Sequence, residues 1–150
     1  MPVPSVGRVL GPVVVITGLS LAAAAPALAE AITVVVAGIE TDGGEIGCAL
    51  YGGPEGFPMD DSLATVQWQD ARRDGVVCSF VGLVPGAYAV AVSHDFNGNQ
   101  RTDTNFFGIP TEPWGVTNNV RPMLRAPSFE EAAVELSPGT ALRVTVEVAE

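Results

Sequence analysis

Oxygen-bearing side chains recur at alternate positions in one short run, DFNGNQRTD at residues 95–103. Counted from the first residue of the run, positions 1, 3, 5 and 9 are Asp95, Asn97, Asn99 and Asp103. A hard divalent cation takes six to eight oxygen ligands at about 2.4 Å, and alternate residues of a tightly curled loop all point inward. With the backbone carbonyl of Arg101 at position 7, this spacing predicts a calcium site.

The run departs from the calcium-binding helix–loop–helix pattern at two positions. Position 6 is Gln100, where a Gly normally permits the sharp turn, and position 12 is Phe106, where a bidentate Glu normally closes the site. A further ligand would have to come from elsewhere, and Glu112 and Asp42 are the candidates. The alternative is an Asx-rich turn in which the Asp and Asn side chains bind their own backbone.

Other catalytic groupings find little support in the sequence. His94 is the only histidine, and although Asp95 follows it, neighbouring residues on a strand point to opposite faces. The sequence contains no Gly-x-Ser-x-Gly nucleophile motif. We therefore assign no catalytic residue. A metal-assisted or acid/base hydrolase that uses His94, Asp95, Asp103 and Glu112 stays the alternative function.

The composition limits the class of protein and its partners. The 150 residues are 47% hydrophobic, which supports one ordinary folded domain rather than a disordered chain. At pH 7 the formal net charge is -10, from 17 acidic and 7 basic side chains. Because such a chain repels polyanions, nucleic acid and anionic membrane surfaces are poor partners.

The N-terminal segment, residues 1–29, is predicted to be a signal peptide. Arg8 supplies a positive charge, residues 9–25 are almost wholly apolar, and residues 27–29 read Ala-Leu-Ala, a cleavage pattern. A retained membrane anchor is the alternative, but Gly and Pro interrupt a run that is short for a span. We therefore expect a periplasmic or secreted domain of residues 30–150, with no stable membrane insertion after cleavage.

Export changes the interpretation of the two cysteines, Cys48 and Cys78. An oxidising compartment allows them to pair, and the bond would close a loop of about 30 residues. The alternative is two buried free thiols on separate strands, because the sequence supplies no distance between them.

Short stretches rich in Val, Ile, Thr and aromatic residues alternate with Gly, Pro and Asp clusters, which is typical of an all-β sandwich. The seven predicted strands are residues 31–39, 45–51, 64–69, 76–81, 87–94, 132–136 and 141–148. The last alternates apolar and polar residues, so it should cover a core on one face. Residues 87–93 carry no charge, which predicts a central strand.

The sequence also predicts two local motifs. The run Leu83-Val84-Pro85-Gly86-Ala87-Tyr88 predicts a turn whose Tyr hydroxyl binds nearby backbone. Ser128 and Glu131 have the spacing of a capping box, which predicts a single helical turn.

The segment from residue 95 to residue 127, here called the excursion, shows little strand pattern. Loops of this length in a compact domain are usually functional or disordered. The apolar residues of this segment predict an ordered loop that packs on the sandwich, and they are Phe106, Phe107, Ile109, Trp114 and Met123.

The chain resembles domain-of-unknown-function family 2141, which comprises small exported bacterial proteins. The matching motifs are Leu83-Val84-Pro85-Gly86-Ala87-Tyr88-Ala89-Val90, His94-Asp95-x-Asn97-Gly98-Asn99, Asp103-Thr104-Asn105, Phe107-Gly108-Ile109-Pro110-Thr111-Glu112-Pro113-Trp114-Gly115, Asn118-Asn119 and Pro127-Ser128-Phe129-Glu130-Glu131-Ala132. The resemblance implies an immunoglobulin-like or transthyretin-like sandwich and no assigned activity. The family usually has an acidic residue where Phe96 stands and Gly where Gln100 stands, so Phe96 should pack on the sandwich rather than coordinate an ion.

Together these observations predict an exported, non-enzymatic β-sandwich with a calcium-ordered loop. Aromatic side chains at loop tips are common recognition anchors, so Trp114 and Phe107 form the expected binding surface. The expected partner is an envelope polymer or protein.

Overall fold

The computed structural model describes residue 2 and residues 30–150. The predicted signal peptide, apart from residue 2, lies outside these residues. In the described part of the chain, no helix has both the length and the apolar character that a membrane span requires.

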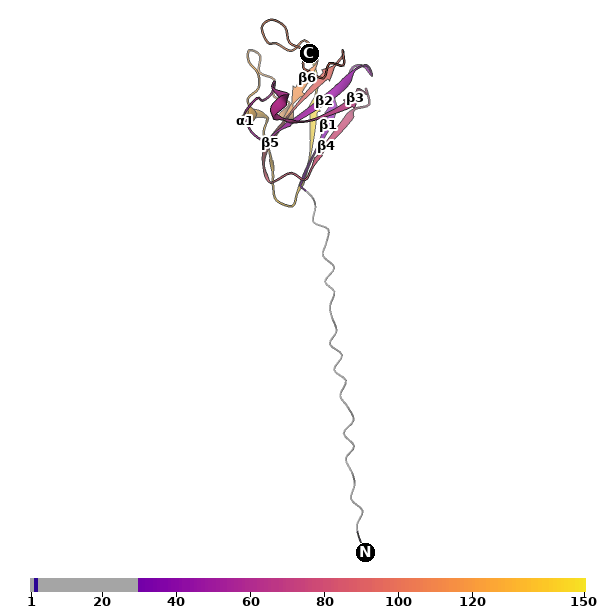
Figure 1. Ribbon diagram of the computed structural model, residues 1–150, viewed down its shortest axis with the longest axis vertical. Coiled ribbons are helices and arrows are strands. Elements are labelled where there is room, and N and C mark those ends of the chain that lie inside the picture. The colour runs from indigo at the N-terminus through magenta and orange to yellow at the C-terminus, as the bar shows by residue number, and fades with distance from the viewer. Residues whose placement is uncertain (1, 3–29) are drawn as a thin grey trace.

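The described residues form an all-β structure with one short α-helix (Figure 1). The strands are β1 (Ala31–Ala37), β2 (Glu45–Tyr51), β3 (Thr65–Asp70), β4 (Val76–Val81), β5 (Gly86–Asp95), β6 (Trp114–Val116), β7 (Val134–Leu136) and β8 (Ala141–Glu147). The helix is α1 (Phe129–Ala132), and two 3-10 turns are η1 (Asp61–Leu63) and η2 (Thr117–Asn119).

These strands form two sheets. The smaller sheet has the order β4-β1-β8, and the larger has the order β3-β2-β5-β6 with β7 also paired to β5. The pair of β1 and β8 is parallel, and the other pairs are antiparallel. β5 therefore lies in the interior of the larger sheet, as the uncharged run at residues 87–93 predicted.

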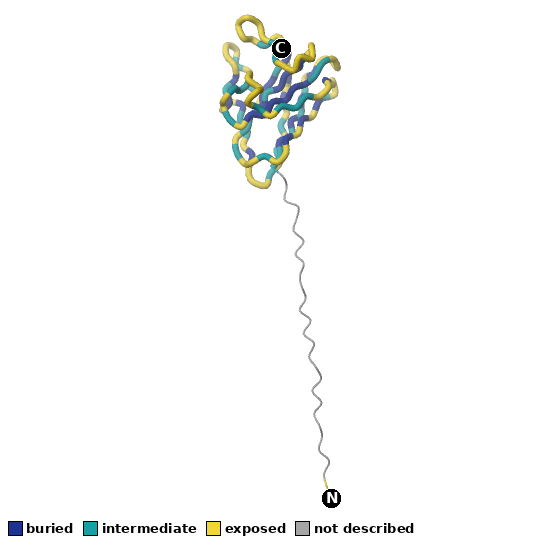
Figure 2. Tube along the Cα trace, in the orientation of Figure 1, coloured by how far each residue is buried: buried dark blue, intermediate teal, exposed yellow. Residues whose placement is uncertain are grey.

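The core lies between the two sheets, where alternate residues of each strand meet. β1 contributes Ile32, Val34 and Val36 to the same buried cluster that holds Ile46 of β2 and Val92 of β5. Figure 2 shows this pattern as buried stretches along the strands and exposed turns at their ends. The alternation expected for the last strand is confirmed, because Val146 and Val148 are buried while Arg143, Thr145 and Glu147 are exposed.

The disulfide prediction is also confirmed. Cys48 of β2 and Cys78 of β4 are both fully buried and bonded to each other, with their Cα atoms 6.5 Å apart. Because β2 and β4 belong to different sheets, the bond ties the two layers together through the core.

Both predicted local motifs are present. The hydroxyl of Tyr88 donates a 2.8 Å hydrogen bond to the carbonyl of Val84, which closes the turn before β5. The Ser128 side chain accepts from the backbone of Glu131, while the Glu131 side chain accepts from the backbone of Ser128. These reciprocal bonds start α1.

All seven predicted strands occur, and the ends of β2 and β4 are those predicted, while the other five have shifted ends. β1 stops at residue 37 because Gly38 takes a left-handed φ of 79°, and a Cβ there would lie 2.5 Å from the carbonyl oxygen of Val148. β7 starts at residue 134 because Ala132 belongs to α1. The sequence did not predict β6, which lies inside the excursion.

Candidate functional site

The excursion starts from a buried carboxylate at the end of β5. Asp95 is fully buried, and its Oδ1 accepts hydrogen bonds from the backbone N–H groups of Asn97 (3.1 Å) and Gly98 (2.8 Å). Its Oδ2 accepts from the N–H of Gln100 at 2.6 Å. Gln100 has a φ of 57°, so it makes the left-handed turn for which a Gly was expected. One carboxylate therefore organises the whole turn.

The other predicted ligand side chains come together above this turn. Asn97 Nδ2 donates to Oδ2 of Asp103 at 2.5 Å, and Asn99 Nδ2 donates to Oδ1 of the same carboxylate at 3.0 Å. The amide oxygens accept from the backbone, Asn97 from the N–H of Asn99 and Asn99 from the N–H of Arg101. The structure thus brings the predicted residues into one network, whose bonds are those of the Asx-rich turn.

The two candidates for a further ligand lie in different places. Glu112 is buried beside the turn, where Oε1 accepts from the N–H of Phe96 at 2.9 Å and Oε2 from the N–H of Asp103 at 3.2 Å. Asp42 accepts instead from the N–H of Arg73 at 2.7 Å. Within the described ranges, no three His, Cys, Asp or Glu side chains form a group suited to hold a metal ion. Glu112 braces the loop through both of its oxygens.

His94 is a structural side chain in this arrangement. It is 1% exposed, and its Nε2–H donates to the carbonyl of Gly43 at 2.8 Å, because a carbonyl only accepts. Phe96 lies against it with ring centroids 4.3 Å apart, and Phe96 itself stays half exposed. His94 and Asp95 are therefore directed to different partners, as neighbours on a strand should be.

Beyond the turn, the excursion forms a narrow hairpin that ends in an apolar tip. Thr104 pairs with Pro110, and the side chain of Asn105 accepts from the N–H groups of Phe107 (2.9 Å) and Ile109 (3.1 Å). The prediction that the apolar residues pack on the sandwich is wrong for this tip. Phe106 is 97% exposed, Phe107 82% and Ile109 58%, and Met123, further along the excursion, is 96% exposed. The hairpin holds Phe106, Phe107 and Ile109 away from the core.

Trp114 behaves differently from Phe107, although both were assigned to one binding surface. It belongs to β6, is half-buried, and has the guanidinium of Arg121 4.5 Å from its ring centroid. Trp114 lines a cleft that Phe107 does not line.

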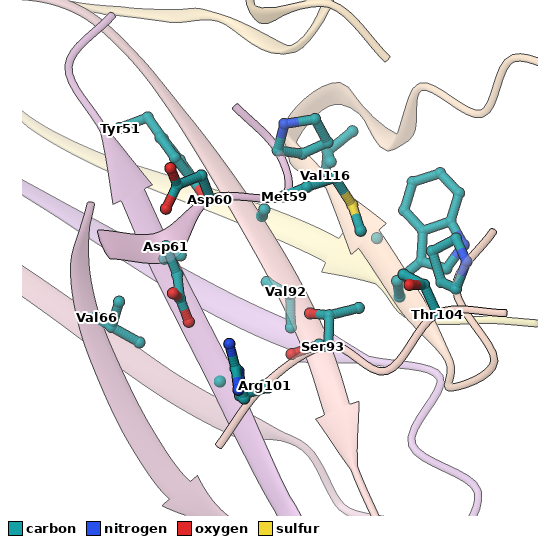
Figure 3. Close-up of a pocket in the computed structure, with 18 of the residues that line it drawn as sticks. Tyr51, Met59, Asp60, Asp61, Val66, Val92, Ser93, Arg101, Thr104 and Val116 are labelled. Atoms are coloured by element: carbon teal, nitrogen blue, oxygen red, sulfur yellow. The ribbon is translucent and has the colours of Figure 1, made fainter. Parts of the chain in front are cut away.

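This cleft, here called the sheet cleft, lies over the outer face of the larger sheet and has a volume of about 370 Å³ (Figure 3). Its floor includes small residues of β2 and β5, which are Gly47, Ala49, Ala91 and Ser93, and Val66 and Val116 also line it. Trp68 of β3 and Trp114 of β6 also line it, together with Asp60, Asp61 and Arg101 from loops. The sequence did not predict the sheet cleft, because its residues come from four strands and from the loops at residues 58–61 and 101–110. Of the residues that line it, only Trp114 was predicted to belong to a binding surface, and Trp68 was not.

Tyr51 lies at one end of the sheet cleft and carries an unusual hydroxyl. The side chain is 1% exposed, and the hydroxyl has no hydrogen-bond partner in the part of the chain that the structure describes. Burial, followed by the charges of Asp61 and Asp60, raises the pKa of Tyr51 to about 12. The phenol therefore stays protonated and offers an unused donor.

The motifs quoted from the sequence agree with the comparison to known families. Residues 34–143, well over half of the chain, match the model of a family described as an uncharacterized protein conserved in bacteria. No curated protein and no solved structure matches the chain. The protein belongs to domain-of-unknown-function family 2141.

Proposed function

We propose that this protein is an exported binding module rather than an enzyme. Residues 1–29 are removed as a signal peptide, and residues 30–150 form one immunoglobulin-like or transthyretin-like sandwich in the periplasm or outside the cell. The module binds an envelope polymer or protein through the excursion. The exposed aromatic pair of Phe106 and Phe107 at the hairpin tip is the observation that carries this proposal.

Two features of the tip support a recognition role. Exposed apolar side chains that gather at one place usually mark an interaction site, because each stays in unfavourable contact with water until it is covered. The tip also stands on a braced base, where Asp95 and Glu112 accept five backbone hydrogen bonds between them. A rigid base lowers the entropy that binding would otherwise cost.

A calcium ion held by the turn is the second part of the proposal. The ligands would be side-chain oxygens of Asp95, Asn97, Asn99 and Asp103 with the carbonyl of Arg101. The convergence of Asn97 and Asn99 on the carboxylate of Asp103 supports it. If the side-chain amides of Asn97 and Asn99 rotated by about 180°, each oxygen would take the place of its NH2 group. This rotation would break the hydrogen bonds that the amide oxygens now accept from the backbone N–H groups of Asn99 and Arg101.

The hydrolase alternative receives less support from the same geometry. Asp95 and Glu112 use their carboxylate oxygens for backbone N–H groups, and Nε2 of His94 binds the carbonyl of Gly43. None of these three side chains lines the sheet cleft. A general base needs a free atom within reach of substrate, which favours binding over catalysis as the proposal.

Cosedimentation of the full chain with purified cell-wall polymer tests the recognition role. We expect the chain to pellet with the polymer, and Phe106→Ser with Phe107→Ser to abolish this without lowering the melting temperature. Val84→Ser is the matched control, because Val84 is 71% exposed and lies before the start of β5, whereas the hairpin tip follows the end of β5. Equal pelleting of the double variant and the control would contradict the proposal.

Calcium titration tests the ion separately. Millimolar calcium should raise the melting temperature of the wild type and change its tryptophan fluorescence, but change neither in Asp103→Asn. Absence of both effects in the wild type would remove the ion from the proposal and leave the tip unaffected.

A further inference from the structure

The outer face of the larger sheet is covered at one end only. Around Tyr51, a second buried cluster includes Phe129 of α1, Ala132 and Val116, with Phe57 packed against it. Toward the other end, the floor of the sheet cleft includes the small residues Gly47 of β2 and Ala91 and Ser93 of β5. These side chains are too small to fill the layer above the strands. An accessible hollow of about 370 Å³ therefore lies where a covering element would otherwise pack.

Indole rings of two strands line this hollow. Trp68 lies on β3 and Trp114 on β6, with β2 and β5 between them in the sheet. Both rings are half-buried, and the guanidinium of Arg121 covers one face of Trp114, which leaves the other face of that ring for a ligand. Aromatic faces attract flat arrays of polarised C–H groups as well as other rings. The hollow is therefore suited to a ligand with a flat apolar face.

The charged side chains of the sheet cleft have both signs. Figure 3 shows Asp61 and Arg101 directed toward the same part of the cleft from different segments. Among the described residues, no ion pair involves Asp60, Asp61 or Arg101. Asp60 binds Ser62 through Oδ1 only. The cleft thus holds acceptors and donors that a ligand could use.

This mixture restricts the chemistry of the ligand. The carboxylates of Asp60 and Asp61 repel an anion, and the guanidinium of Arg101 repels a cation. A hydrocarbon would desolvate all three groups and bind none of them. A neutral polyol avoids these penalties, because its hydroxyl groups donate to carboxylates and accept from a guanidinium.

The buried hydroxyl of Tyr51 is an independent observation at the same place. Buried polar groups nearly always have partners, and this donor has none among the described residues. Tyr51 lines the sheet cleft beside Asp60 (Figure 3). Because the hydroxyl itself is buried, a ligand oxygen would reach it only if neighbouring side chains at this end of the cleft moved aside.

We propose that the sheet cleft binds a neutral oligosaccharide, which stacks on Trp68 and Trp114 and hydrogen-bonds to Asp60, Asp61 and Arg101. This site goes beyond the proposed function, which places partner contact at the hairpin tip. The two sites are separable, because Phe106 and Phe107 do not line the sheet cleft.

Isothermal titration of the purified full chain tests the proposal with defined probes. The neutral probes are maltotriose, cellotriose and triacetylchitotriose, and the charged probes are glucuronate and tetramethylammonium. We expect saturable binding of at least one neutral trisaccharide and none of the charged probes. Trp68→Ala should weaken that binding about tenfold or more, because it removes one stacking face. Asp61→Asn should weaken it severalfold through a lost charged acceptor.

The control variants distinguish a loss of saccharide binding from a loss of folding. Asp61 is exposed, so Asp61→Asn should keep the wild-type melting temperature even if Trp68→Ala does not fold. Val81→Ala is the apolar control, because Val81 is 70% exposed on the smaller sheet. Binding of a charged probe alone, no binding of any trisaccharide, or equal binding by wild type and Asp61→Asn would overturn the proposal. Polymer binding through the tip is measured separately and does not depend on these outcomes.

Discussion

The indole ring of Trp68 lies directly over Gly47, its partner in the pairing of β3 with β2. A Cβ atom at position 47 would lie 2.5 Å from the ring, closer than two carbon atoms approach without displacement. The absence of a side chain at Gly47 therefore determines where Trp68 lies over the sheet.

Gly47→Ala should push the Trp68 ring away from the sheet. We expect a loss of about 1–3 kcal/mol in the free energy of unfolding, since an added methyl group in a tight contact causes strain. Near-UV circular dichroism should change in the tryptophan region, and saccharide binding should weaken. Gly52→Ala is the matched control, because a Cβ there meets Tyr88 at an ordinary 3.7 Å. Identical spectra and stabilities for the two variants would contradict this account of Trp68.

Asp95→Asn should loosen the start of the excursion. The amide keeps the shape of the carboxylate but loses its charge and turns an NH2 group toward backbone donors. Because Asp95 is fully buried and accepts three hydrogen bonds, we expect a loss of about 2–4 kcal/mol. Hydrogen exchange should accelerate at the amides of Gly98 and Gln100. Asp74→Asn is the control, and because its ion pair with Arg72 is exposed, it should change stability far less.

Removal of the disulfide should destabilise the protein, because the unfolded chain gains conformational freedom. Cys48 and Cys78 are 30 residues apart, and a closed loop of that length restrains the unfolded state by about 3–4 kcal/mol. Denaturant unfolding of the Cys48→Ala and Cys78→Ala double variant measures this loss. Wild type under reducing conditions is the second measurement. An unfolding midpoint that stays at the wild-type value would contradict the prediction.

The lowered pKa of Glu131 predicts how the stability of the protein changes at acid pH. The hydrogen bond from Arg125, followed by that from the backbone of Ser128, lowers the pKa of Glu131 to about 2 from 4.5. Because the folded-state pKa is lowered, this stabilisation is present above about pH 4.5 and is lost as pH falls toward 2. Melting temperatures of wild type and Glu131→Gln should therefore converge across this window. Glu130→Gln, which removes one carboxylate from the same helical turn, is the matched control.

The raised pKa of Tyr51 predicts that the stability of the protein falls as the pH becomes alkaline. Its pKa is raised to about 12, so above pH 10 the unfolded phenol ionises while the folded one does not. Wild-type stability should therefore fall between about pH 10 and 12, and Tyr51→Phe should remove that part of the fall. At pH 7 the same variant should be as stable as wild type or about 1 kcal/mol more stable, because an unpartnered buried hydroxyl is lost. A large loss of stability at pH 7 would reveal a partner for the hydroxyl.

Several features follow from local residue pattern, because short-range geometry dictates them. Alternation of apolar and polar residues marks one face of β8, and the Ser128 and Glu131 spacing starts α1. The Tyr88 corner likewise involves atoms of one turn, since its acceptor is the carbonyl of Val84. The Asp95 turn belongs to the same class, because its bonds join residues at most five apart.

Other features depend on contacts between distant segments, for which a local pattern carries no information. Strand β6 has three residues, and it exists because β5 pairs with it on one side and Ala149 bonds to Trp114 on the other. The same pairing partly buries Trp114, whereas the hairpin directs Phe107 into solvent. Hydrophobicity alone does not distinguish these two aromatic residues. The sheet cleft is the strongest case, since Asp61 and Arg101 are 40 positions apart and both line it only because η1 and the excursion flank the same sheet face.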